Sequence, residues 1–301
     1  MTSLTETPVR SLRLSDLGVK IENPKLQQVT PLPRTDSLFL EVERALSLGF
    51  AGVLLSGPPG TGKSVLARKL ALALTTPDAV EAVQFHLSYQ YEDFIEGFTA
   101  SDKGFEPQKK VFAKICETAG ERPDRTYVLV IDEISRCDVA RVFGEALTYI
   151  ETDKRNLEFT TSSGTVMSVP DNLVIIGTMN PWDKGVDELD VALERRFAQI
   201  DILPDSNTLR GLLIEGKAEP AFAEKVIAFF NYILKLENAA CHLGHGYLLR
   251  CTNSQDAEFV WRLRLSPFFR RACRLDNDLY KMIEREWQKV IATESAPAAA
   301  E

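Results

Sequence analysis

The sequence offers few of the features that mark secreted, membrane-bound or metal-clustered proteins. Its five cysteines are scattered, with no CxxC pair and no Cys/His cluster at metal-ligand spacing, which predicts free thiols in a reducing cytosol. Residues 1–18 contain no apolar stretch of the kind that a secretory signal needs. Nowhere do about 18 apolar residues run together, so we expect no membrane span and a cytoplasmic protein.

Positive charge is also in short supply. The chain has 35 Lys and Arg against 43 Asp and Glu, which gives a formal net charge of −8. A broad basic face for nucleic acid is therefore not expected, because such a face depends on clustered positive charge. We expect any DNA contact to be indirect or confined to loops.

Apolar runs recur along the first two thirds of the chain, and stretches with helical spacing, such as 139–151, separate them. An apolar run without alternation indicates a strand that is buried on both faces. The expected strands lie at 51–57, 82–88, 126–134, 172–180 and 197–203. This alternation of strands and helices predicts an α/β fold, with a three-layer αβα core around a parallel, doubly wound sheet.

Composition divides the chain into four segments. Residues 1–34 mix Pro, Ser, Thr and Leu without periodicity, which favours an extended N-terminal arm, and the α/β core is expected at 35–204. Within the core, the Ser-Ser-Gly centre of 157–169 predicts a β-hairpin. Residues 205–293 carry only helical patterns and predict a small all-helical domain. The low-complexity end, 294–301, is expected to be disordered.

A glycine-rich turn lies between the first expected strand and the helix that follows it. The turn fits G-x-x-x-x-G-K-[ST], and its strand-to-helix context is the one in which this pattern binds phosphate. Backbone N–H groups would surround the phosphates, Lys63 would reach the β- and γ-phosphates, and the Ser64 hydroxyl would bind Mg²⁺. The predicted nucleotide-binding residues are Gly57, Pro58, Pro59, Gly60, Thr61, Gly62, Lys63 and Ser64.

Two adjacent carboxylates lie near the end of the apolar run at 126–134. Burial of a carboxylate is unfavourable unless a cation or a specific role compensates it. Asp132 is predicted to bind Mg²⁺ together with Ser64, and Glu133 is predicted to orient and polarise the attacking water. The sequence therefore predicts a Mg²⁺-dependent P-loop nucleoside triphosphatase.

Polar residues at two further strand boundaries extend the predicted site. Asn180 ends the apolar run at 172–180, where an amide can hydrogen-bond the attacking water or the γ-phosphate without adding negative charge. Arg195 and Arg196 precede the strand at 197–203, and an arginine there suits a finger offered to the nucleotide of a neighbouring subunit. The alternatives are a turn residue for Asn180 and a surface pair for the arginines.

The order of these motifs, GPPGTGKS, VLVIDE, IIGTMN and LERRF before a helical region, resembles the AAA+ superfamily over roughly residues 37–290. The blocks FHLSYQYEDFIEGF (85–98) and LGHGYLLR (243–250) are similar to the McrB family. These are the GTP-hydrolysing subunits of modification-dependent restriction systems, in the dynein-related/MoxR-like branch. In that family an insertion near the second helix, here about 85–110, and the hairpin at 157–169 tend to face the ring pore or a partner.

The resemblance implies further site residues and a quaternary arrangement. The family pattern M-N-x-x-D is kept from Met179 to Asp183, which places Asp183 among the catalytic or nucleotide-sensing residues. A homo-oligomeric ring is implied, with a hexamer as the family expectation, a helical lid, and DNA contact through pore loops at most. Ser135 stands where the family usually has Asn, and the stretch from Asn180 to Gly185 is altered. These departures leave ATP slightly favoured over GTP.

Together these features predict a ring-forming triphosphatase, with Mg²⁺ as its cofactor, as the motor or regulatory subunit of an McrBC-like restriction or anti-phage complex. No PD-(D/E)xK nuclease motif is apparent in the sequence, so a separate nuclease or effector subunit is the expected partner. Two alternatives stay open: a MoxR-like ATPase chaperone that remodels a protein, and a nucleotide-gated assembly scaffold with little turnover. His245, inside the LGHGYLLR block, is interpreted as a packing or hydrogen-bonding residue.

Overall fold

A five-stranded parallel sheet forms the centre of the N-terminal part of the protein. The computed structural model describes residues 29–101, 104–181, 191–274 and 276–292. The strand order is β2-β5-β8-β1-β9, and every neighbouring pair is parallel. The strands are β1 (Gly52–Ser56), β2 (Val80–Gln84), β5 (Tyr127–Asp132), β8 (Leu173–Met179) and β9 (Phe197–Asp201). The predicted α/β fold with a parallel sheet is confirmed.

One helix precedes the first strand, and the others lie between strands. They are α1 (Ser37–Ser47), α2 (Lys63–Leu74), α3 (Tyr91–Phe94), α4 (Val111–Gly120), α5 (Val139–Phe143), α6 (Ala146–Tyr149) and α7 (Val191–Glu194). Short 3-10 turns lie at Pro77–Ala79, Ile134–Arg136 and Thr152–Lys154. The helix expected at 139–151 is thus divided, because Gly144 has a φ of +50°, outside the helical region.

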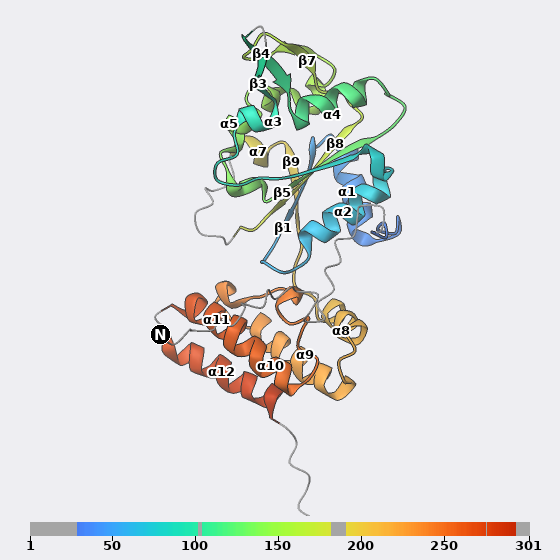
Figure 1. Cartoon of the computed structure of the whole chain (residues 1–301). Coiled ribbons are helices and arrows are strands. Elements are labelled where there is room, and N and C mark those ends of the chain that lie inside the picture. The colour runs from blue at the N-terminus through green and yellow to red at the C-terminus, as the bar shows by residue number, and fades with distance from the viewer. Residues whose placement is uncertain (1–28, 102–103, 182–190, 275, 293–301) are drawn as a thin grey trace, which may run out of the picture.

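Both faces of the sheet are covered, which explains why its central strands β1, β5 and β8 are apolar without alternation. Along β1, Val53 and Leu55 belong to one buried cluster together with residues of α1 and α2. Leu54, which lies between them, belongs to a second cluster that includes Phe112 of α4 and Phe143 of α5. Successive strand residues point to opposite faces, so β1 contributes to both clusters. Figure 1 shows the sheet with α1 and α2 lying next to each other beside it.

Two small antiparallel hairpins extend from this core. One pairs β3 (Glu96–Ser101) with β4 (Gly104–Lys109), and the other pairs β6 (Glu158–Thr160) with β7 (Val166–Ser168). The Ser163 backbone N–H donates to Glu96 Oε1 at 3.0 Å, so the two hairpins contact each other. Figure 1 places both hairpins at the end of the molecule opposite the C-terminal helices.

The C-terminal part is helical and has its own core. Its helices are α8 (Ser206–Glu215), α9 (Pro220–Leu234), α10 (Ser254–Val260), α11 (Ser266–Cys273) and α12 (Asn277–Ile291). One π-helical turn (Trp261–Leu265) and two 3-10 turns (Ala239–Cys241 and His245–Tyr247) lie between them. Phe230, Phe269 and Trp287 are fully buried in this second core. Asp205, at the start of this part, caps α8 by accepting from the Thr208 N–H.

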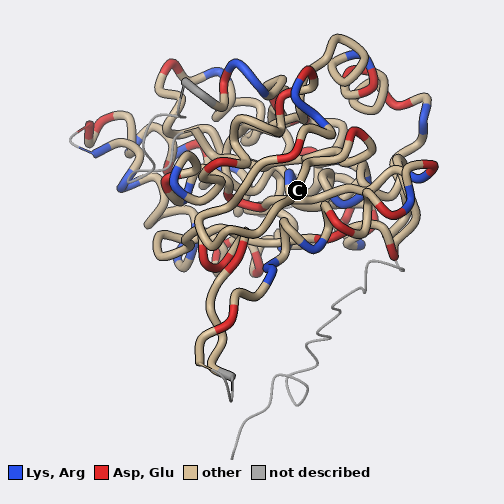
Figure 2. The backbone as a smooth tube through the Cα atoms, turned by 90° about the horizontal axis from the view of Figure 1, so that it is seen from above, with Lys and Arg blue, Asp and Glu red and all other residues tan. Residues whose placement is uncertain are grey.

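The described helices and the distribution of charged residues bear on two of the expectations from the sequence. Within the part of the chain that the structure describes, no helix combines the length and apolar character needed to cross a membrane. In the view of Figure 2, acidic and basic residues are interspersed along the described backbone. The molecule therefore presents mixed charge to its surroundings.

Candidate functional site

The loop between β1 and α2 lies at the carboxyl edge of the sheet. Gly62, the last residue before α2, has a φ of +87°, a left-handed conformation that glycine adopts without strain. The Lys63 ammonium is buried and donates to the carbonyl oxygens of Gly57 at 2.8 Å and Pro58 at 2.9 Å. Burial holds the pKa of Lys63 below its ordinary value, although the charges of Glu133 and Asp132 oppose this shift.

The acidic pair at the end of β5 faces this loop. The Ser64 hydroxyl donates to Asp132 Oδ1 at 2.7 Å, although the two residues are 68 positions apart in the chain. A hydroxyl oxygen and a carboxylate oxygen at this distance are ligands that suit Mg²⁺, which completes its shell with water and substrate phosphate. Among the described residues no cluster of three or more His, Cys, Asp or Glu is placed to hold a metal. The geometry therefore fits a magnesium site shared with nucleotide.

Glu133 follows Asp132 in an unusual backbone conformation. Its φ of +57° and ψ of +43° lie in the left-handed region, which few residues other than glycine occupy. Its backbone N–H donates to Thr178 Oγ1 at 3.1 Å, and its carboxylate accepts from Arg136 Nε at 3.4 Å. Such conformations cluster at functional sites, where the surrounding contacts maintain them. The Glu133 side chain is 31% exposed, so water can reach it.

Asn180 and Thr178 come from β8, the strand between β1 and β5. Asn180 is 8% exposed and directly follows Met179, whose carbonyl accepts from the Gly57 N–H at 3.3 Å. Asn180 thus lies beside the phosphate-binding loop. Thr178 donates to Asp132 and accepts from the Glu133 N–H, so one hydroxyl links both members of the acidic pair. Asp183 lies outside the described residues.

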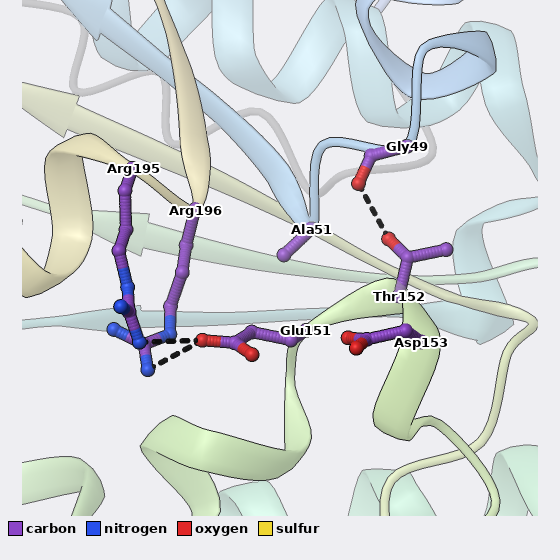
Figure 3. A pocket seen from close by; sticks show the side chains of 7 residues that line it. All are labelled: Gly49, Ala51, Glu151, Thr152, Asp153, Arg195 and Arg196. Carbon is purple, nitrogen blue, oxygen red and sulfur yellow. Dashed lines mark hydrogen bonds and ion pairs between the residues drawn. The ribbon is translucent and has the colours of Figure 1, made fainter.

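The predicted arginines lie at the other edge of the sheet. β1 and β9 are parallel neighbours with Gly52 opposite Phe197, so the residues before β9 lie beside the start of β1 and not its end. The Arg195 side chain is 65% exposed, whereas that of Arg196 is 6% exposed. Both guanidinium groups donate to Glu151 Oε1, at 2.9 Å and 2.6 Å. Figure 3 shows the two side chains converging on this carboxylate.

The C-terminal helices contact the phosphate-binding loop through backbone atoms. The Gly244 N–H donates to Pro59 O at 3.1 Å and the Gly246 N–H donates to Gly60 O at 2.8 Å. A Cβ on Gly244 would lie 2.1 Å from the Gly60 carbonyl carbon, so only glycine allows this approach. The helical part is therefore placed directly over the loop.

Comparisons with known proteins identify this arrangement. Residues 52–197 match the family described as AAA domain (dynein-related subfamily). Residues 52–197 are an AAA domain. The chain is 40% identical over 207 residues to the type IV methyl-directed restriction enzyme EcoKMcrB subunit of Escherichia coli (strain K12), which covers 65% of this chain and 45% of that protein.

A second relative is more distant. The type II restriction enzyme BsuMI component YdiS of Bacillus subtilis (strain 168) is 25% identical over 188 residues, or 48% of this chain and 55% of that protein. The chain spans about half the length of the curated relatives it matches. The predicted resemblance to the dynein-related branch and to McrB is confirmed, and the chain is similar to subunits of restriction systems.

The structure adds residues of the AAA domain and its helical neighbour that the sequence analysis missed. A cavity of about 860 Å³ lies between Pro59 and Asn180 on one side and the C-terminal helices on the other. The helical wall contributes three arginines, Arg270, Arg271 and Arg274. Their clustering in FFRRACR was the available signal, but sequence alone did not place them opposite the loop. Thr178 could have been noticed as a hydroxyl inside an apolar strand.

His245 agrees with its interpretation as a hydrogen-bonding residue. The side chain is 4% exposed, and its Nε2 accepts from the Asp205 backbone N–H at 2.7 Å. An accepting Nε2 requires the neutral ring, and burial holds the pKa of His245 below its ordinary value. The histidine thus fastens the glycine turn over the phosphate-binding loop to the start of α8.

Proposed function

We propose that this chain hydrolyses ATP or GTP between the subunits of a homo-oligomeric ring, with ATP slightly favoured. The observation that carries this proposal is the separation of the predicted site residues onto two edges of one sheet. The phosphate-binding loop follows the carboxyl end of β1, and Arg195 and Arg196 precede the amino end of the neighbouring β9. Five strand residues span about 16 Å, so the arginines are remote from the phosphates of their own subunit.

The residues at the carboxyl edge have the chemistry for hydrolysis within one subunit. Lys63 exchanges its bonds to the loop carbonyls for the β- and γ-phosphate oxygens, and Ser64 and Asp132 hold Mg²⁺. The bound Mg²⁺ neutralises phosphate charge. Glu133 orients water in line with the γ-phosphate and accepts its proton, while Asn180 hydrogen-bonds the water or the γ-phosphate. Asp183 keeps its assignment as a catalytic or nucleotide-sensing residue on the family resemblance alone.

The amino edge supplies the part that each subunit lacks in its own site. We assign the role of finger to the exposed Arg195, which offsets the charge that develops on the neighbour's γ-phosphate. A contact between the carboxyl edge of one copy and the amino edge of the next is head-to-tail, and such contacts form a ring when the rotation between neighbouring copies closes. A hexamer is the expected closure from the family resemblance.

The biological setting that we propose is an McrBC-like restriction or anti-phage complex with a separate nuclease or effector subunit. The support is the identity of the relatives: one is named as a subunit of a restriction enzyme and the other as a component of one. The two hairpins, which lie away from the helical part, are the proposed surfaces for pore or partner contact. DNA contact is then indirect or made through these loops.

Mixed rings test the action between subunits. Arg195→Ala and Glu133→Gln should each bind nucleotide and hydrolyse it poorly. The first lacks the finger, which contributes about 10³ to 10⁵ in rate in P-loop enzymes, and the second lacks the base. In a mixture, an Arg195→Ala subunit has an intact Glu133 and can receive the arginine of a Glu133→Gln neighbour, so part of the activity should return. Mixtures that form rings by light scattering but stay inactive at every ratio would refute action in trans. Full activity in both Arg195→Ala and Arg196→Ala would assign the pair to the surface.

The choice of base has a separate test. The altered stretch from Asn180 to Gly185 and Ser135 are the basis for favouring ATP, and competition of labelled ATP by unlabelled GTP measures the preference directly. A tenfold preference for GTP, about 1.4 kcal/mol, would overturn the choice of ATP.

A further inference from the structure

The Glu151 carboxylate pairs with three cationic side chains. Its Oε1 accepts from Arg195 and Arg196, and its Oε2 forms an ion pair with Lys154. The Glu151 side chain is 18% exposed, and the three cations hold the pKa of its carboxyl below the ordinary value, Lys154 most strongly. The carboxylate therefore stays charged over the working pH range and binds all three.

The backbone that carries Glu151 is anchored to the amino edge of the sheet. The Thr152 hydroxyl donates to Gly49 O at 2.6 Å, in the turn before β1. The largely buried Arg155 donates to four backbone carbonyls, which belong to Ile150, Ala51, Pro170 and Leu173. These bonds tie the segment around Glu151 to the loops that precede β1 and β8, so Glu151 has a fixed position relative to the sheet.

The two arginines use this fixed carboxylate differently. The Arg196 backbone is part of the sheet edge, since its carbonyl accepts from the Ala51 N–H at 2.8 Å, and its side chain is buried. Arg195 is exposed, and its guanidinium group pairs with the Glu151 carboxylate. An exposed arginine otherwise samples many rotamers, and holding it in one place lowers the entropy lost when it reaches a phosphate.

Glu151 also allows two like charges to lie side by side. The two guanidinium groups share one carboxylate oxygen, so they are close enough to repel each other, and the anion between them offsets that repulsion. Without Glu151, the exposed Arg195 would turn away from the buried Arg196 into solvent. The geometry of the finger thus depends on a residue 44 positions earlier in the chain.

We propose that Glu151 is a positioning residue for catalysis in the neighbouring subunit: it holds Arg196 inside the subunit and Arg195 at the surface from which Arg195 reaches the neighbour's phosphates. This inference rests on the proposed function. It predicts that loss of Glu151 has the same kind of effect as loss of Arg195, a defect in the neighbour's site. Loss of Glu133, in contrast, impairs the subunit's own site.

Steady-state kinetics give the first test. Glu151→Ala should lower kcat by about 10²-fold, the scale of a misplacement of about 1 Å, with KM and nucleotide binding unchanged. Glu151→Gln, which can still accept from an arginine but lacks the charge, should lose less. The matched control is Glu224→Ala, which removes the carboxylate of another Arg–Glu pair, with Arg210 in the helical part, and should keep full kcat. Full kcat in Glu151→Ala would overturn the inference.

Mixed rings give the decisive test because they separate donor defects from acceptor defects. Glu151→Ala mixed with Glu133→Gln should recover activity, because the Glu151→Ala subunit keeps its own site and receives a well-placed arginine. Glu151→Ala mixed with Arg195→Ala should stay inactive, because both are defective donors. A defect in the subunit's own site, or a general loss of structure, predicts a different pattern, with no recovery alongside Glu133→Gln.

The control mixture separates the two levels of the argument. Arg195→Ala with Glu133→Gln tests action in trans alone, and its failure would remove both the proposed intersubunit site and the role of Glu151. If that control mixture recovers activity and the mixture of Glu151→Ala with Arg195→Ala recovers it too, action in trans would stand. Only the role of Glu151 would then be refuted. If Glu151→Ala does not form rings by light scattering, Glu151→Gln takes its place in the same mixtures. Recovery of Glu151→Gln by Arg195→Ala but not by Glu133→Gln would equally refute the inference.

Discussion

The two edges of the central sheet are built in opposite ways. At the carboxyl edge, Lys63 and Asn180 are each 8% exposed, and the helical part contacts the phosphate-binding loop beside them. At the amino edge, Arg195 is 65% exposed and stands on a buried support formed by Arg196 and Glu151. Enclosure suits residues that exclude water from a bound phosphate, whereas exposure suits a group that must act on another molecule.

In the proposed function, this contrast divides the catalytic groups of one chain between two incomplete sites. The carboxyl edge has residues to bind phosphate, metal and water, but the described part of that edge contributes no arginine from α7–β9. The amino edge has the arginines but no phosphate-binding loop. Changes at the carboxyl edge should therefore affect the chain's own nucleotide, and the effects should be independent of the arginines.

Loss of the Glu133 carboxylate should give the largest effect at the carboxyl edge. Glu133→Gln keeps the size of the side chain but cannot accept a proton, so turnover should fall at least about 10²-fold while nucleotide binding is retained. Phosphate release measures turnover, and a fluorescent-nucleotide titration measures binding. Steady-state hydrolysis equal to that of the unchanged protein would show that Glu133 is not the base.

Loss of the Lys63 ammonium should instead weaken binding itself. Lys63→Ala removes a charge-assisted contact to the phosphates, and such hydrogen bonds contribute about 1.5–3 kcal/mol. The titration should therefore show a dissociation constant raised by about one to two orders of magnitude. Arg196→Ala, at the opposite edge, is the comparison variant and should leave this constant unchanged. An unchanged affinity in Lys63→Ala would contradict the assignment of the phosphate-binding loop.

The sequence predicts features that are formed by contiguous residues, and it does not predict contacts between distant positions. The phosphate-binding loop is eight contiguous residues with a strand before it and a helix after it, so its pattern is visible in the sequence alone. The central strands β1, β5 and β8 were predictable because burial on both faces makes them apolar almost throughout. The edge strand β2 has exposed polar residues and lies at Val80–Gln84, so the expected range of 82–88 only overlaps it. Glu151, in contrast, meets Arg195 from 44 positions away, and no local pattern marks it as their partner.

The elements that were missed have weak or misleading local signals. The β3–β4 hairpin carries Gly104 and Pro107 and has little buried apolar surface, so it lacks the alternation that indicates a strand. The expected helix at 139–151 has a continuous helical pattern, yet the Tyr91 ring lies 2.7 Å from the position of a Cβ on Gly144, and the chain turns there. The contact with the distant Tyr91 decided the second case.

A change at the contact between the helical part and the phosphate-binding loop should have a smaller effect. Gly244→Ala would place a methyl group 2.1 Å from the Gly60 carbonyl carbon, and overpacking of this kind costs about 1–3 kcal/mol. We expect a lower melting temperature and weaker nucleotide binding. Gly211→Ala is the matched control, since a Cβ at Gly211 meets nothing within 4 Å. Equal behaviour of the two variants would show that the glycine turn does not constrain the loop.

The smallest predicted effect belongs to Thr178, the hydroxyl that joins Asp132 to Glu133. Thr178→Val keeps the shape of a fully buried side chain but removes the donor to Asp132 and the acceptor for the Glu133 N–H. A hydrogen bond contributes about 1 kcal/mol net, which corresponds to several-fold in an equilibrium constant. Because Asp132 then loses the group that orients it, the Mg²⁺ concentration for half-maximal turnover should rise several-fold.

The comparison variant is Thr178→Ser, which keeps the hydroxyl and should retain the ordinary Mg²⁺ requirement. The mixed-ring experiment extends the test, because Thr178→Val should sort with Glu133→Gln as a defect of the subunit's own site and should be complemented by Arg195→Ala. An unchanged Mg²⁺ requirement in Thr178→Val would show that the hydroxyl does not orient the acidic pair. Complementation by Glu133→Gln instead would place Thr178 with the arginines and erase the distinction between the two edges of the sheet.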